Sequence, residues 1–81
     1  MRAAVSGKYQ AVLKRVRVGG EGYRRLFGSP DISVFWVWPA GQAFSISRSV
    51  ELETYGPSPI ARFERLKRLL ENPEYCERMG L

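Results

Sequence analysis

The pattern of apolar and polar residues predicts a β-hairpin in the middle of the chain. Residues 32–38 are nearly all apolar, and residues 42–48 mostly alternate between polar and apolar side chains. Between these segments, Pro39 fixes its own φ, and Gly41 can adopt a positive φ without strain. We therefore expect an antiparallel hairpin over about 32–48, closed by a three-residue loop with a glycine bulge.

The register of this hairpin decides where the two tryptophans lie. The three-residue loop gathers on one face the side chains of Val34, Trp36, Trp38, Phe44 and Ile46. A two-residue loop at Ala40 and Gly41 shifts the pairing by one residue, which turns every side chain to the other face. Trp36 and Trp38 then lie over serines, as a surface on which bases could stack. Because Ala40 would need a positive φ in that loop, we favour the first register, with both tryptophans mainly in the core.

Residues 9–18 fit either a strand or a helix. An amphipathic helix would align the apolar residues Val5, Tyr9, Val12, Leu13 and Val16. The β-branched valines and the near alternation of residues 14–18 favour a strand instead. A third strand would also stabilise the hairpin, which is marginal alone. We favour a strand over about 9–18 and keep the helix as the alternative.

A helix is expected over about 59–71. Ser58 is a good N-cap, and Pro59 suits the first helical position. The apolar stripe of this helix, which should pack on the apolar face of the hairpin, consists of Ile60, Phe63, Leu66, Leu69 and Leu70. The basic residues expected outside or along its rim are Arg62, Arg65, Lys67 and Arg68.

A short last helix should follow the stop at Asn72 and Pro73 and end at Gly80. The expected fold class is therefore α+β: a small antiparallel sheet built on the 32–48 hairpin, packed by two C-terminal helices. With 81 residues, the chain is expected to form a single small domain over 1–81.

Positive charge is concentrated in the first third of the chain. The net charge is +5, and residues 1–28 carry seven basic residues against one acidic residue, Glu21. Tyr9 and Tyr23 are interleaved with these basic residues. A basic face of this kind attracts phosphate backbones or acidic protein surfaces.

The residue types present exclude several kinds of reactive site. The chain has no histidine and one cysteine, Cys76, so it has no Ser-His or Cys-His pair and no internal disulfide. Glu51 and Glu53 share a strand face but lack a third ligand, which favours a solvated face over a metal site. Residues 19–22 lack the frame of a phosphate-binding loop and are expected to form a turn. We expect no metal, no cofactor and no enzymatic activity.

The expected location is cytoplasmic. No stretch approaches the roughly 20 apolar residues of a membrane span, and residues 1–7 lack the apolar core of a signal peptide. The lack of an internal disulfide is also typical of a reducing compartment.

Two functions follow from these observations. The first is a non-enzymatic protein that binds nucleic acid or a nucleoprotein complex through its basic N-terminal face. The alternative is a small phage-type inhibitor, similar in size and character to anti-CRISPR proteins, or an adaptor that binds an acidic surface of a large protein complex. The residues expected to make either contact are Lys8, Lys14, Arg15, Arg17, Arg24, Arg25, Arg62 and Arg65.

Overall fold

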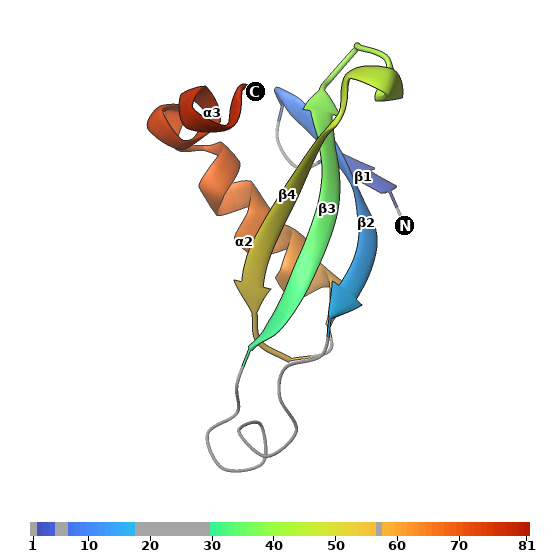
Figure 1. Ribbon diagram of the computed structural model, residues 1–81, viewed down its shortest axis with the longest axis vertical. Helices are drawn as coiled ribbons and strands as arrows, with labels where there is room; N and C mark the ends of the chain where they lie inside the picture. Colours follow the sequence, from blue (N-terminus) through green and yellow to red (C-terminus); the bar gives the residue numbers. More distant parts are fainter. Residues whose placement is uncertain (1, 5–6, 18–29, 57) are drawn as a thin grey trace.

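The structure, a computed structural model, describes residues 2–4, 7–17, 30–56 and 58–81. Within these ranges the chain forms a four-stranded antiparallel sheet with two helices on one side (Figure 1). The elements are β1 (Arg2–Ala4), β2 (Tyr9–Arg17), β3 (Asp31–Pro39), the 3-10 turn η1 (Phe44–Ile46), β4 (Arg48–Thr54), α2 (Pro59–Leu70) and α3 (Pro73–Met79). The strands follow their sequence order across the sheet. The predicted α+β fold is confirmed, and the segment that fitted both strand and helix is strand β2.

The connection between β3 and β4 is longer than either predicted loop. Trp36 pairs with Ser49, and Phe35 pairs with Val50, so both predicted registers are wrong. Gly41 does take the positive φ expected of it, +84°, but it belongs to a longer excursion that includes η1. In the observed register Val50 pairs with Phe35, and both side chains are buried under the helices. The alternation of residues 42–48 gives no sign of this pairing, because Val50 lies outside that segment.

Both helices lie on the same side of the sheet (Figure 1). They pack on the face that carries Phe35 and Val37. The rings of Phe35 and Phe63 meet edge to face, with their centroids 5.2 Å apart. The core cluster on this side consists of Ala11, Phe35, Val37, Val50, Leu52, Leu66, Leu70 and Cys76. Val34 and Trp38 are also buried, on the other face of the sheet. The prediction that α2 covers the tryptophan-bearing face is therefore wrong. Ile60 is also misassigned, since 73% of it is exposed in the first turn of the helix.

The helix ends follow their local sequence signals. The Ser58 hydroxyl accepts a hydrogen bond from the Ala61 amide at 3.4 Å. The Asn72 side chain accepts one from the Glu74 amide at 3.0 Å and so caps α3. Gly80 ends α3 with a φ of +75°. These features confirm the predicted start of α2 and the predicted short last helix.

Arg62 lies in the protein interior, where it joins α2 to the ends of β3 and β4. Its Nη1 donates to the hydroxyls of Ser33 at 2.7 Å and Thr54 at 2.5 Å. Its Nη2 donates to the Asp31 carboxylate at 3.0 Å and to the Gly56 carbonyl at 2.7 Å. Only 3% of Arg62 is exposed, so its predicted place on the helix rim is wrong. The predicted turn residue Asp31 is the buried partner that makes this position tolerable for a charge.

Candidate nucleic-acid interface

The face of the sheet opposite the helices carries basic side chains together with two tryptophans. We name it the tryptophan face. It is formed by Gln10, Val12, Lys14, Arg15 and Arg17 of β2, by Ile32, Val34, Trp36 and Trp38 of β3, and by Ser49, Glu51 and Glu53 of β4.

A β-bulge in β2 decides which basic side chains reach this face. Leu13 pairs with Phe35, whereas Arg15 pairs with Val34. Lys14 is therefore the extra residue of the bulge. Because paired residues of an antiparallel sheet point to the same side, Arg15 lies on the tryptophan face with Val34. Unbroken alternation from Leu13 would have turned Arg15 toward the helices.

The bulge gathers three exposed basic residues within four positions of β2. Arg17 follows Arg15 on the same side, opposite Ile32. The Lys14 side chain also points to this side, with its Nζ 4.3 Å from the centroid of the Trp36 ring. All three basic residues are exposed. A strand that would otherwise divide its charges between two faces thus presents them on one.

Trp36 is the aromatic residue of this face that a ligand can reach. It is half-buried, whereas only 3% of Trp38 is exposed. A cation over an aromatic ring at an exposed site contributes about 0.5–1 kcal/mol. A nucleic-acid base stacked on such a ring contributes about 1–3 kcal/mol. Stacking is therefore the stronger interaction, and a base can displace the Lys14 ammonium from the Trp36 ring.

Phe44 and Gln10 hold the tryptophans in place. The Phe44 ring lies nearly perpendicular to both indole rings, with centroid distances of 6.3 Å to Trp36 and 5.2 Å to Trp38. The Trp38 indole also donates a hydrogen bond to the Gln10 side chain at 3.1 Å. Trp38 is thus held in a fixed position, and Phe44, which is 52% exposed, extends the aromatic surface into the connection that follows β3.

Acidic side chains from β4 partly offset the basic charge. Glu51 forms an ion pair with Arg17, at 2.8 Å between Nη2 and Oε2, and about half of each side chain is exposed. Exposed pairs of this kind contribute about 0–1 kcal/mol. The Arg17 guanidinium can therefore exchange this carboxylate for a phosphate at little cost.

The remaining predicted contact residues lie elsewhere. Arg65 lies on α2, in an open cleft of about 630 Å³ whose charged residues, besides Arg65, are Glu53, Glu64 and Arg68. Lys8 precedes β2 by one residue, about 20 Å along the strand from Lys14. Arg62 is buried and is not available as a surface contact. The predicted residues Arg24 and Arg25, like the predicted turn at 19–22, lie outside the described residues.

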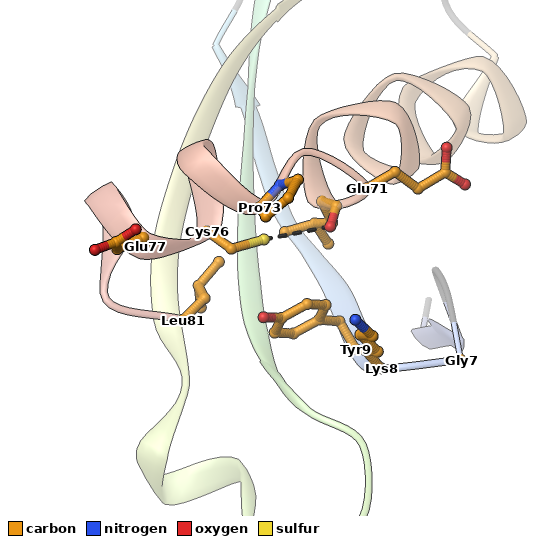
Figure 2. A pocket seen from close by; sticks show the side chains of 9 residues that line it. Gly7, Lys8, Tyr9, Glu71, Pro73, Cys76, Glu77 and Leu81 are labelled. Carbon is orange, nitrogen blue, oxygen red and sulfur yellow. Dashed lines mark hydrogen bonds between the residues drawn. The ribbon is translucent and has the colours of Figure 1, made fainter.

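Lys8 borders a second cleft, of about 580 Å³, between the start of β2 and the junction of α2 and α3 (Figure 2). Tyr9 and Cys76 both line it. The Cys76 thiol donates a hydrogen bond to the Leu70 carbonyl at 3.2 Å. A hydrogen bond with that thiol, together with burial, raises the pKa of the Tyr9 hydroxyl. The thiol proton of Cys76 is therefore satisfied within the fold.

Two kinds of site are not found in the described part of the chain. No group of three or more Cys, Asp or Glu side chains comes together there as a metal site would require. No described helix has the length and apolar character needed to cross a membrane.

Sequence reasoning alone did not identify Trp36 and Phe44 as candidate contact residues. The two-residue hairpin loop considered from the sequence placed Trp36 on a surface. The observed structure also leaves Trp36 partly exposed, but through a different strand pairing, Trp36 with Ser49. The signal for the bulge was the pair Lys14 and Arg15, which interrupts the alternation between Leu13 and Val16.

The sequence matches no protein-family model, and no curated protein or solved structure is significantly similar to the chain.

Proposed function

We propose that the protein is a non-enzymatic nucleic-acid-binding protein and that the tryptophan face is its contact surface. The observation that carries this proposal is the bulge in β2, which brings Lys14, Arg15 and Arg17, here called the basic patch, to the face of the sheet that carries Trp36. Basic groups next to an accessible aromatic ring are the combination that binds a phosphate backbone and a base together. The proposal includes a cytoplasmic location, supported by the lack of an internal disulfide.

The strength of the contact should depend steeply on salt. Each phosphate neutralised by a basic side chain releases condensed counterions, so the logarithm of the affinity falls linearly with the logarithm of the salt concentration. Three such contacts predict a slope of about −2 to −3. Because phosphates carry no sequence information, we expect affinity with little sequence preference.

Titration of labelled nucleic acids by nuclease-treated protein tests this function. Single- and double-stranded DNA and RNA would each be followed by fluorescence anisotropy at about 50 and 200 mM salt. We expect submicromolar binding of at least one of them at the lower salt and a clear loss at the higher salt. If none binds at the lower salt, the proposed function is wrong.

A second candidate function is an inhibitor or adaptor that binds an acidic protein surface. It is favoured by Phe44 and Ile46 of η1, which are 52% and 50% exposed in the connection that leads to the exposed Arg48. Exposed apolar side chains rimmed by charge are typical of protein interfaces. A phage-type inhibitor of this kind would occupy a nucleic-acid path on its target.

Affinity capture after nuclease treatment separates the two functions. A stoichiometric protein partner that survives nuclease and is lost in a Phe44→Ser, Ile46→Ser variant would support the inhibitor. Loss of all captured material on nuclease treatment would support direct binding of nucleic acid.

A further inference from the structure

We infer that the tryptophan face selects single-stranded nucleic acid by stacking one unpaired base on the Trp36 ring. This inference rests on the proposed function, because it names the substrate class of the same surface. It adds a role for Trp36 and a movement of Lys14 that phosphate binding alone does not require.

Trp36 is suited to this role by its exposure and by what covers it. Its ring is half-buried and carries the flexible Lys14 ammonium at 4.3 Å from the ring centroid. A lysine side chain has several rotatable bonds and can leave the ring without moving the strand. Trp38, by contrast, is 3% exposed and bonded through its indole to Gln10. Of these two rings, only Trp36 can accept a base.

Lys14 has a new partner available when it leaves the ring. A base stacked on Trp36 brings its own phosphate near the basic patch, where the Lys14 Nζ can pair with it alongside Arg15. One side chain thus covers the ring in the free protein and binds phosphate in the complex. Phe44 stands at 80° to the Trp36 ring plane and limits where the base can lie.

Base pairing would prevent this contact. Bases in a duplex are stacked on each other and hide their faces, whereas unpaired bases can be splayed onto an aromatic side chain. A duplex can reach Lys14, Arg15 and Arg17 with its phosphates but cannot cover Trp36. The structure therefore favours a preference for single strands over duplexes at equal salt.

The two tryptophans of the chain allow a direct test by fluorescence. In a Trp38→Phe variant the only tryptophan is Trp36, and in a Trp36→Phe variant it is Trp38. Both variants would be titrated with short oligo(dT) and with the same strand paired to oligo(dA). We expect oligo(dT) to quench Trp36 strongly, the duplex to quench it weakly, and Trp38 emission to change little with either.

Affinities measured with labelled oligonucleotides give a second readout that does not need the fluorescence of the variants. Trp36→Leu should weaken oligo(dT) binding by about tenfold, while Trp36→Phe, which keeps a ring, should lose less. Duplex binding should be nearly the same in both. Urea unfolding would confirm that each variant is folded.

The possible outcomes separate this inference from the proposed function. Salt-dependent binding that is equal for single strands and duplexes and indifferent to Trp36→Leu would overturn the inference and leave the proposed function standing. No binding of any nucleic acid at low salt would overturn both and leave a protein partner as the remaining explanation of the surface.

Discussion

The guanidinium of Arg17 lies 2.8 Å from the carboxylate of Glu51, on the same face of the sheet as Lys14 and Trp36. This pair joins β2 to β4 across the central strand β3. Since both side chains are about half exposed, the pair is weak and exchangeable. Glu51 therefore acts as an internal competitor for any anion that approaches Arg17.

Removing this competitor should tighten nucleic-acid binding. In the Glu51→Gln variant, phosphate binding no longer breaks the ion pair between Arg17 and Glu51, and the phosphate is no longer repelled by the Glu51 carboxylate. We expect the affinity to rise by up to about fivefold, equivalent to roughly 1 kcal/mol. Glu64→Gln on α2 makes the same change in net charge away from the tryptophan face and is the matched control. An equal gain in both variants would show that only net charge matters.

Neutralising the basic patch should reduce both the affinity and its dependence on salt. We expect Arg15→Gln with Arg17→Gln to lower the magnitude of the salt slope by about two, because each lost phosphate contact lowers it by about one. Arg65→Gln with Lys67→Gln removes the same charge from the helix side. Anisotropy titrations over a salt series would compare the two. A patch variant that keeps the wild-type slope would remove these residues from the interface.

The interior pair of Arg62 and Asp31 should matter for folding rather than for binding. Asp31→Ala leaves the buried guanidinium without its carboxylate, and removing one partner of a buried ion pair costs about 3–5 kcal/mol. We expect urea unfolding to show a loss of this size. The replacement of both residues, Asp31→Ala with Arg62→Met, should cost less than the two single changes added together. Strict additivity would mean that the 3.0 Å contact contributes little.

Stability should fall at alkaline pH, in part through Tyr9. A hydrogen bond to Cys76 and burial raise its pKa above the usual value of about 10, which the unfolded chain retains. The folded state therefore keeps the proton where the unfolded state loses it. This contribution is complete below about pH 10 and is lost as the pH rises through the folded pKa.

The Tyr9→Phe variant tests this contribution. Unfolding free energies of the variant and of the wild type would be measured across this pH range. We expect the difference between them to shrink as the pH rises, because phenylalanine has no proton to lose. A constant difference would show that Tyr9 titrates alike in both states. Tyr75, whose pKa burial also raises, is present in both proteins and cancels from the comparison.

Local signals in the sequence were sufficient for the helices. Ser58, Asn72 and Gly80 act on backbone groups within a few residues, so the positions of these caps follow directly from chain order. The spacing of apolar residues in 9–18 fitted both a helix and a strand, and the β-branched valines and the near alternation of residues 14–18 favoured the strand that is observed. Both of these features lie within one segment of the chain.

The burial of Arg62 and the pairing of β3 with β4 depend on contacts between residues far apart in the chain, so the sequence did not predict them. The partner that makes a buried Arg62 tolerable lies thirty-one positions away, at Asp31. The pairing of β3 with β4 is set by the helices, which cover Phe35 and Val50, rather than by the turn beside Gly41. The candidate site depends on two features of the strand pairing: the register between β3 and β4, which leaves Trp36 partly exposed, and the bulge in β2, which turns Arg15 to the same face.

The central claim is that the tryptophan face, and not the helix side, binds nucleic acid. Chemical shifts of isotope-labelled protein during titration with oligo(dT) test it most directly. We expect the largest changes at the amides of Arg15 and Arg17 and at the Trp36 indole, with little change at Leu66 or Cys76. Changes confined to α2 and α3, or no change at low salt, would contradict the claim.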